Sequence, residues 1–334
     1  MKKTVAVVLL ALLSLAVLFA QPSSETEEVL TVYAYDSFSG DWGPAGILIP
    51  DFEAKTGIKV NLVGAGDAVE MLSRVILEGD RTDADVILGI SDDFAYKAYP
   101  YLESYESALL ADIDDEIEFD PEHRLLPYDY GYFAFVWDSE SGIRKPESLA
   151  DLTLPEYKDK VILIDPRTSS VGLGLMFWTY NVFGDEFTDW WLKMKDNALT
   201  ITDGWSSAYG LFTEGEAPIV LSYTTSPVYH VMYEGTTRYQ TLVFSEGHEA
   251  TIEGLGIRKG TEKRAEAEAF IDYILSDGQL DTAIANSMYP ASSAVELPDA
   301  YDYAPEPDVM FTATELSEDF KNELLERWTD AMTK

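Results

Sequence analysis

The sequence predicts an α/β fold of two lobes, in which each lobe is a mainly parallel sheet flanked by helices. Apolar, β-rich runs alternate with amphipathic stretches along the chain, which is the order that builds such sheets. The two groups of elements follow each other without a Gly/Ser linker, so we expect lobes that share strands across a hinge. The 334 residues include 7 Trp, 20 Tyr and 15 Phe, enough large side chains to fill cores of this size.

The first group has the order β-α-β-α-β, which predicts a doubly wound parallel sheet. Its first helix follows a loop at residues 36–41 and is expected to carry Pro44 near its start and Gly57 just beyond its end. The third strand is apolar enough to be buried on both faces, as parallel strands are. The predicted strands cover residues 29–35, 59–63 and 84–90, and the predicted helices cover 42–56 and 68–77.

The second group contains further strand-like and helix-like runs. Apolar side chains recur every four residues from Leu316 to Met332, so the chain is expected to end on a packed helix. The other elements are predicted as strands at 132–137, 161–164 and 219–223 and helices at 172–183, 187–194 and 262–275. The resulting division is lobe 1 at residues 21–125 and 255–334, including the C-terminal helix, and lobe 2 at residues 126–254.

Residues 1–20 have the three-part pattern of a secretory signal peptide. Lys2 and Lys3 form the basic region, residues 5–19 are an almost unbroken apolar run, and Ala20 is a small residue for cleavage. The run of ~15 residues is short for a bilayer span, which needs about 20 residues. A retained anchor is the alternative. We therefore expect a periplasmic protein that is soluble after cleavage and not inserted in the membrane.

The charge and the residue types exclude several functions. The 23 Lys and Arg and 60 Asp and Glu give a net charge of −37, which repels nucleic acid and anionic lipid and attracts cations. Solubility in a salty medium is the alternative reason for this acidity. No Cys is present, so disulfides, thiolate metal sites and Cys nucleophiles are excluded. The three His are scattered and no nucleotide-binding loop occurs, so we expect no enzyme, metal or cofactor.

Candidate ligand-binding residues stand at the ends of predicted strands, where open α/β sheets bind their ligands. Ser169 and Ser170 precede an apolar helix, so their hydroxyls and the first free N–H groups face one point. Such a point suits a phosphate or another anion. Simple capping of the helix is the alternative.

Aromatic and hydroxyl side chains stand at several other strand ends. Aromatic faces attract cations, and Asp36, Asp41 or Asp67 can add a counter-charge to a flat cation. For any single aromatic residue, the alternative to a ligand contact is that its ring packs in the hydrophobic core. The candidates are Tyr35, Trp42, Trp205, Tyr223, Thr224, Thr225, Ser226 and Tyr229.

Several motifs follow one another over nearly the whole mature chain. They are YAYDSF at 33–38, DWGP at 41–44, YDYGYFAF at 128–135, DPRTS at 165–169, GWS at 204–206, LSYTTSP at 221–227, FSEGH at 244–248 and MYP at 288–290. In this order they resemble the periplasmic thiamine-binding proteins of ABC importers. The resemblance implies a type II solute-binding fold that closes around thiamine, thiamine monophosphate or thiamine diphosphate and delivers it to a membrane permease. We expect a monomer.

The resemblance also implies a set of ligand contacts. The phosphate is expected near the two serines, and the rings between aromatic walls. The implied contacts are Asp67, Ala68, Ser169, Ser170, Trp205 and residues 223–226, with Tyr35, Trp42 and Tyr229 as walls.

Two positions depart from the family pattern. Ala68 stands where the family commonly has Gly, and Ser287 stands where well-known relatives carry Trp. If that Trp is a stacking wall, the pocket of this chain is more open on one side.

Three other functions fit less well. Iron carriers of this fold use adjacent tyrosines, and no Tyr-Tyr pair occurs in the chain. A polyamine binder fits the acidity but does not need the anion-binding turn at Ser169 and Ser170. Thiamine-degrading enzymes of similar fold use a Cys nucleophile, which is absent. A binding protein for thiamine is therefore expected, with a binder of a polyamine or ferric ion as the alternative.

Overall fold

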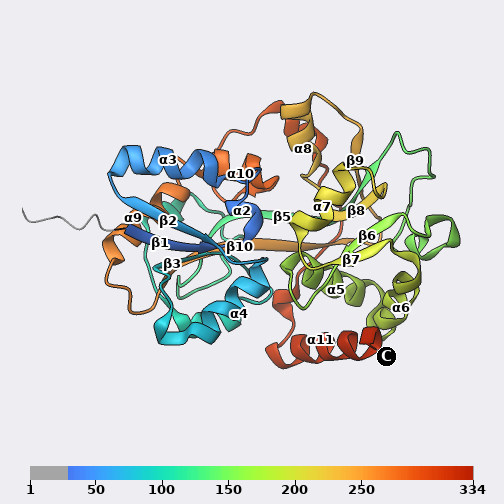
Figure 1. Ribbon diagram of the computed structural model, residues 1–334, viewed down its shortest axis with the longest axis horizontal. Helices are drawn as coiled ribbons and strands as arrows, with labels where there is room; N and C mark the ends of the chain where they lie inside the picture. Colours follow the sequence, from blue (N-terminus) through green and yellow to red (C-terminus); the bar gives the residue numbers. More distant parts are fainter. Residues whose placement is uncertain (1–28, 334) are drawn as a thin grey trace, which may run out of the picture.

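The computed structural model describes residues 29–333, and the predicted signal peptide, residues 1–20, lies outside these described residues. Twelve strands among them form one network whose main path is β2-β1-β3-β10-β5-β8-β6-β7. Figure 1 shows two groups of elements at opposite ends of the molecule, joined by β5 and β10. The predicted α/β class with mainly parallel sheets is confirmed.

The elements have the following bounds. The strands are β1 (Val29–Ala34), β2 (Lys59–Gly64), β3 (Val86–Ser91), β4 (Leu102–Glu103), β5 (Leu126–Asp138), β6 (Val161–Ile164), β7 (Thr200–Thr202), β8 (Ile219–Tyr223), β9 (Tyr239–Leu242), β10 (His248–Arg258), β11 (Tyr289–Pro290) and β12 (Met310–Phe311). The α-helices are α2 (Asp36–Ser39), α3 (Ala45–Thr56), α4 (Ala68–Glu78), α5 (Ser170–Phe183), α6 (Phe187–Asn197), α7 (Trp205–Thr213), α8 (Pro227–Tyr229), α9 (Arg264–Ile274), α10 (Gln279–Asn286) and α11 (Glu318–Thr333). None of the helices in the described part of the chain has the length and apolar character of a membrane span.

The parallel part of the first lobe consists of β2, β1 and β3. Strand β1 pairs with both neighbours, for example through Val32 and Val86. Every residue of β3 is buried, which agrees with its apolar sequence. Helix α3 ends at Gly57, whose φ of +77° is a conformation that glycine adopts without strain, and whose N–H donates to the Glu53 carbonyl.

The long strands β5 and β10 belong to both lobes. Residues 126–132 of β5 pair antiparallel with β10, and residues 133–137 pair antiparallel with β8. β10 pairs with β3 on its other side. The sequence predicts only residues 132–137 as strand here, because Gly254 and Gly256 weaken the strand pattern of β10. Pairing on both sides outweighs this weak local preference.

The second lobe is built on β8, β6 and β7, which run parallel. Helix α5 is apolar on all sides, and its first ten residues are buried. It lies close to β5, since a Cβ on Gly174 would stand 2.0 Å from the Phe133 ring. This close approach places the start of α5 at the junction of the two lobes.

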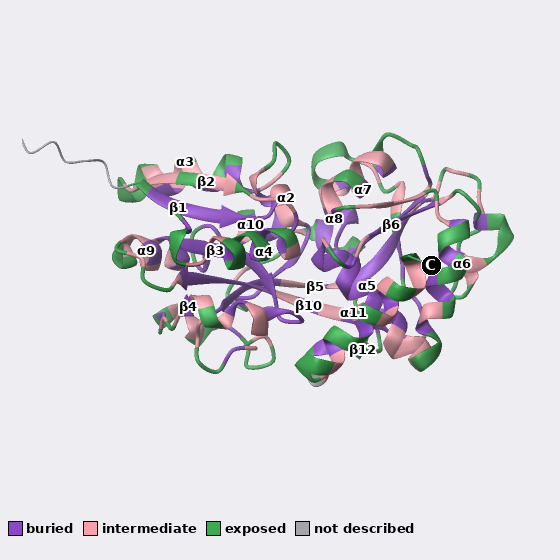
Figure 2. Ribbon diagram, turned by 60° about the horizontal axis from the view of Figure 1, so that its bottom comes forward, coloured by how far each residue is buried: buried purple, intermediate pink, exposed green. Residues whose placement is uncertain are grey.

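One large hydrophobic cluster extends through both lobes. Figure 2 shows buried residues along the central strands and exposed residues on the outer helices and loops. A smaller hydrophobic cluster contains Tyr289 and Tyr301 and includes residues of α8 and α10. The two strands that connect the lobes therefore run through packed core.

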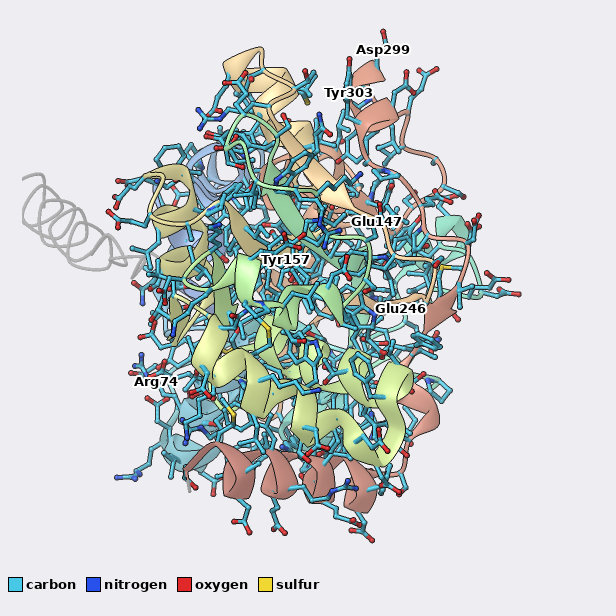
Figure 3. All side chains as sticks on the ribbon, turned by 90° about the vertical axis from the view of Figure 1, so that its right-hand side faces the viewer. Arg74, Glu147, Tyr157, Glu246, Asp299 and Tyr303 are labelled. Atoms are coloured by element: carbon cyan, nitrogen blue, oxygen red, sulfur yellow. The ribbon has the colours of Figure 1, made fainter. Side chains whose placement is uncertain are left out.

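The C-terminal helix α11 packs against the second lobe. Trp328 meets Trp191 of α6 edge to face with ring centroids 5.4 Å apart, and Arg327 forms an ion pair with Asp185. Figure 3 shows α11 alongside the helices of that lobe. Helix α11 also contacts the first lobe, since Lys321 Nζ donates to the Asp93 carbonyl and Tyr96 OH donates to Asn322 Oδ1. The division into lobes, including the place of this helix, remains a proposal.

The segment after β1 also differs from the prediction. The expected loop at 36–41 contains the short helix α2, and α3 begins at Ala45 instead of residue 42. Gly43 lies so close to the Ser37 carbonyl that a Cβ would stand 2.0 Å from its oxygen, so the chain turns tightly there.

Two residues that the sequence places on buried helix faces are exposed in the structure. Ile76 of α4 is 37% exposed, and Ala265 of α9 is exposed as well.

Candidate ligand-binding cleft

A cavity of about 740 Å³ lies between the two lobes. Seven of the twelve predicted site residues line it: Tyr35, Trp42, Asp67, Ser170, Trp205, Tyr223 and Tyr229. The other lining residues are Asp36, Ser37, Gly40, Val171, Ser206, Tyr209, Gly210, Thr213, Glu214, His230, Glu234, Glu253, Ala285, Asn286, Ser287 and Met288. The cavity thus receives residues from α2, α5, α7, β8, α8, β10 and α10, and Tyr35 from the end of β1.

The lining is acidic and aromatic. Among the described residues that form it, none is Lys or Arg, whereas five carry a carboxyl group and six are Tyr or Trp. The carboxyl groups are those of Asp36, Asp67, Glu214, Glu234 and Glu253. A cavity of this composition favours a flat ligand with a positive charge.

A carboxylate of the protein occupies the point where the sequence predicts an anion site. Ser169 Oγ donates to Asp67 Oδ2 at 2.9 Å, and the Trp205 N–H donates to the same oxygen at 3.2 Å. The Ser170 N–H donates to Asp67 Oδ1 at 3.1 Å, and Asp67 also caps α4 through the Ala68 N–H at 2.7 Å. The predicted donor cluster therefore exists, but its partner is Asp67. Asp67 precedes α4 of the first lobe, and its partners lie at the start of α5 and α7 of the second lobe, so this carboxylate joins the two lobes.

Asp67 is 7% exposed, and burial raises its pKa to about 6 against the opposing effect of its hydrogen-bond donors. Gly204 permits the close contact, since a Cβ there would stand 3.3 Å from Asp67 Oδ2. The charge of this group can therefore change near neutral pH.

Trp205 begins α7, where the sequence predicts a turn that presents the ring. Its Nε1 donates to Ser222 Oγ at 2.8 Å, and its ring stacks on Tyr209 with centroids 4.8 Å apart and planes 20° from parallel. The side chain is half-buried and lines the cavity. Tyr209 covers one ring face, and the remaining surface is part of the cleft wall.

Tyr223 lines the cavity, and the next three residues lie behind it. Thr224, Thr225 and Ser226 are 0%, 0% and 1% exposed. Thr225 Oγ1 donates to the Ser287 carbonyl, and the Tyr223 N–H donates to Ser226 Oγ at 3.2 Å. These three residues position the wall instead of lining it. Ala68 and Ser169 likewise contact Asp67 without lining the cavity.

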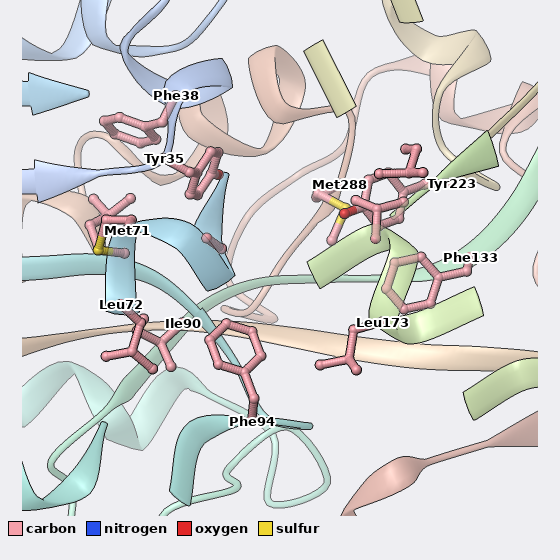
Figure 4. Close-up of a cluster of buried hydrophobic side chains, with 14 of the residues drawn as sticks. Tyr35, Phe38, Met71, Leu72, Ile90, Phe94, Phe133, Leu173, Tyr223 and Met288 are labelled. Carbon is pink, nitrogen blue, oxygen red and sulfur yellow. The ribbon is translucent and has the colours of Figure 1, made fainter. Parts of the chain in front are cut away.

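The two aromatic walls come from opposite lobes. Figure 4 shows Tyr35 beside Phe38 on one side, and Tyr223 beside Met288 on the other. Gly89, with φ of +94°, makes room for Tyr35, because a Cβ there would stand 2.1 Å from its ring. The backbone of β3 thereby fixes the position of the first wall.

The lobes also meet at less deeply buried residues of the cavity. Trp42 is 75% exposed and faces Tyr229 with ring centroids 6.3 Å apart. Ser206 Oγ donates to Asp36 Oδ1 at 3.3 Å. Together with Asp67, these contacts connect the two sides of the cleft.

Sequence reasoning missed several lining residues. His230 connects Tyr209 OH, at 2.9 Å from Nε2, to Glu234 Oε2, at 2.6 Å from Nδ1. The spacing of four between His230 and Glu234 is a helical signal that could have shown this pair. Glu253 gave no such signal, because its strand was not predicted.

Ser287 lines the cavity at the C-terminal end of α10. Its φ of +56° is left-handed, which is uncommon for a residue other than glycine. Its small side chain stands on one side of the cleft. The more open pocket expected there remains a prediction.

Comparison with known proteins gives consistent results. A family model described as bacterial extracellular solute-binding protein matches residues 83–314. The chain is 38% identical over 302 residues to the thiamine-binding periplasmic protein of Brucella melitensis biotype 1, covering 88% of each chain. It matches a solved periplasmic thiamin binding protein with a TM-score of 0.86 and 35% identity, covering 93% of this chain and 98% of the other. The identity to iron uptake protein A1 of Synechocystis is 27% over 271 residues, 75% of this chain and 73% of the other.

Proposed function

The chain belongs to the family of bacterial extracellular solute-binding proteins, and from this premise we propose that its cleft captures thiamine in the periplasm. The type II solute-binding fold expected from the sequence is confirmed by the match to the solved thiamin binding protein. The family consists of solute-binding proteins, and it is not a family of enzymes. Delivery of the ligand to the permease of an ABC importer is part of the proposal.

The observation that carries the proposal is the composition of the cavity wall. Five carboxyl groups and six Tyr or Trp side chains line it, and none of the described lining residues is Lys or Arg. Thiamine is a flat molecule with a permanently cationic thiazolium ring. Aromatic faces and carboxylates together attract such a ring, and an anionic solute would meet an unfavourable field.

The relatives favour thiamine over the two alternatives. Two of the matched proteins carry thiamine in their names and share 35–38% identity with the chain over most of its length. The iron uptake protein is more distant, at 27% identity. Ferric ion and polyamine therefore remain the weaker alternatives.

The phosphate esters of thiamine are part of the proposal under one condition. The donors at Ser169, Ser170 and Trp205 already hold the Asp67 carboxylate. A phosphate can use these donors when Asp67 is protonated or moves aside, because two anions repel each other at one donor cluster. Free thiamine needs no such change.

Calorimetric titration of the mature protein tests the proposal. At fixed salt and pH 7, we expect thiamine to bind with a dissociation constant below about 1 μM, which corresponds to about −8 kcal/mol or better. Spermidine and ferric ion serve as competing ligands and should bind more weakly. Tight binding of either one, with no heat and no rise in melting temperature at millimolar thiamine, would show that the proposal is wrong.

A further inference from the structure

Two acidic side chains lie opposite each other where the lobes join. Glu253 of β10 pairs in register with Asp129 of β5. Opposed residues of antiparallel strands project to the same face of the sheet. Glu253 is 7% exposed and Asp129 is fully buried. The cavity therefore ends, at Glu253, on a pair of carboxyl groups withdrawn from water.

Three side chains, those of Tyr35, Tyr128 and Asn286, hold this pair in place. Tyr35 OH of the β1 end and Tyr128 OH of β5 donate to Glu253 Oε2 at 3.0 and 2.5 Å. Asn286 of α10 donates through Nδ2 to Asp129 Oδ2 at 2.8 Å and to Tyr35 OH at 2.9 Å. Within the described part of the chain, both donors to Glu253 reach the same oxygen, Oε2. Glu253 is thus fixed in orientation while Oε1 stays available to a ligand.

The two carboxyl groups differ in their access to the cavity. Glu253 lines it, whereas Asp129 does not, and Asp129 Oδ1 has no hydrogen-bond partner among the described residues. Burial raises the pKa of Glu253 to about 7, and burial with the nearby Glu253 raises the pKa of Asp129 well above its usual range. The pair can therefore retain a proton near neutral pH, so Glu253 can either accept or donate a hydrogen bond.

We infer that Glu253 binds the amino-substituted edge of the ligand's pyrimidine ring, and that Tyr35, Tyr128 and the Asp129–Asn286 pair are its positioning residues. An aminopyrimidine presents an N–H donor beside a ring-nitrogen acceptor. Because Oε2 of Glu253 already accepts from two tyrosines, Oε1 serves that edge: it accepts from the amino group when ionised and can donate to the ring nitrogen when protonated. The inference rests on the proposed function and adds the direction in which the ligand lies.

The rest of the cleft agrees with this direction. Tyr35 and Tyr223 line the cavity from two sides (Figure 4), and Tyr35 OH donates to Glu253 Oε2. The Asp67 cluster, with Ser170 and Trp205, is a separate polar site of the same cavity. A ligand with its pyrimidine at Glu253 and its alcohol or phosphate end toward Asp67 satisfies both polar sites and leaves its cationic ring beside aromatic faces.

A chemical double-mutant cycle tests the inference. The ligands are thiamine and 4′-deaminothiamine, which has hydrogen in place of the amino group. The proteins are the mature wild type, Glu253→Met and Glu253→Gln, titrated at one pH and one salt concentration. The wild type is expected to bind thiamine at least tenfold more tightly than the deamino compound. Glu253→Met should bind the two ligands within about threefold of each other, because the partner of the amino group is gone.

Glu253→Gln retains a side chain that can accept and donate, so it should keep most of the discrimination. Glu216→Met is the control, because Glu216 is an exposed acid that does not line the cavity and should leave the ratio of the two affinities unchanged. Equal binding of both ligands by the wild type would overturn the inference, even if Glu253→Met does not fold. Discrimination that persists in a folded Glu253→Met would overturn it as well. Failure of the wild type to bind either ligand would instead contradict the proposed function.

Discussion

Asp67 connects the two lobes through a single side chain. The donor cluster that it occupies could be predicted, because Ser169 and Ser170 form a local capping pattern ahead of an apolar helix. Its partner could not, since Asp67 lies 102 residues from Ser169 and only the fold brings them to 2.9 Å. The same holds for Glu253, which belongs to a strand that pairing with distant neighbours creates.

Replacing Asp67 with Asn should favour phosphorylated ligands. The neutral amide removes the charge that competes with phosphate for the donors of Ser169, Ser170 and Trp205. At pH 8, we expect the affinity for thiamine monophosphate relative to thiamine to rise about tenfold. In the wild type the same ratio should fall as pH rises from 5 to 8, because Asp67, with a pKa of about 6, becomes charged over that range.

Titration of both ligands at pH 5 and pH 8 checks this prediction. Ser206→Ala is a suitable control, since it removes another polar contact between the lobes, to Asp36, without touching the donor cluster. An unchanged ratio in Asp67→Asn at both pH values would show that phosphate binds elsewhere.

At the scale of the element, the strength of the local pattern decides what the sequence predicts. Strand β8 was predicted with its observed bounds, residues 219–223, because it is a short apolar run buried at every position. Strand β10 was missed because glycine and polar residues interrupt it, and the helix α10 was missed as well. Helix α11 was found, but its neighbour was not, since an apolar stripe does not specify which surface it covers.

Helix α11 also contacts the segment that follows β3. Lys321 is 6% exposed and donates through Nζ to the Asp93 carbonyl at 2.8 Å. Burial lowers the pKa of Lys321, while the surrounding acids oppose this effect. The charged groups that face this cluster are Asp92, Asp93, Glu249, Glu318 and Lys97.

Lys321→Met should therefore destabilise the protein in a pH-dependent way. Burial raises the pKa values of Asp93 and Glu249 to about 8, so both are protonated at pH 5 and need the cation less than at pH 8 or above. We expect a loss of about 1–3 kcal/mol in the free energy of unfolding at pH 8.5 and a smaller loss at pH 5. Urea denaturation at the two pH values measures it.

Lys195→Met is the control for this helix. Lys195 Nζ contacts the Met332 carbonyl at an exposed position, so its loss should cost less than about 0.5 kcal/mol at either pH. If Lys321→Met loses the same free energy of unfolding at pH 5 and pH 8.5, Lys321 does not compensate the charge of the buried acids.

For the whole molecule, buried acids and net charge act in the same direction. Burial raises the pKa of Asp67 and of Asp92 to about 6 and the pKa of Glu253 to about 7. It raises the pKa of Asp93 and of Glu249 to about 8. In the unfolded chain these groups titrate near 4. Between about pH 4 and pH 8 the folded state therefore binds more protons, so stability rises as pH falls. Protonation also reduces the repulsion that accompanies a net charge of −37.

The melting temperature should accordingly be higher at pH 5 than at pH 8. Below about pH 4 it should fall again, since the hydrogen bond from Arg238 holds the pKa of Asp138 below its usual value and that contact is lost on protonation. Calorimetric scans at constant ionic strength give the profile. A melting temperature that falls steadily from pH 8 to pH 5 would contradict the burial of ionisable acids in the folded protein.

The most direct test of the central claim is a crystal structure of the mature protein grown with thiamine. The account predicts electron density for thiamine in the cavity of about 740 Å³ between the lobes. The pyrimidine should lie at Glu253, the rings beside Tyr35 and Tyr223, and the hydroxyethyl end toward Asp67. Thiamine bound outside this cavity, or bound in it with the pyrimidine at Asp67, would contradict the account.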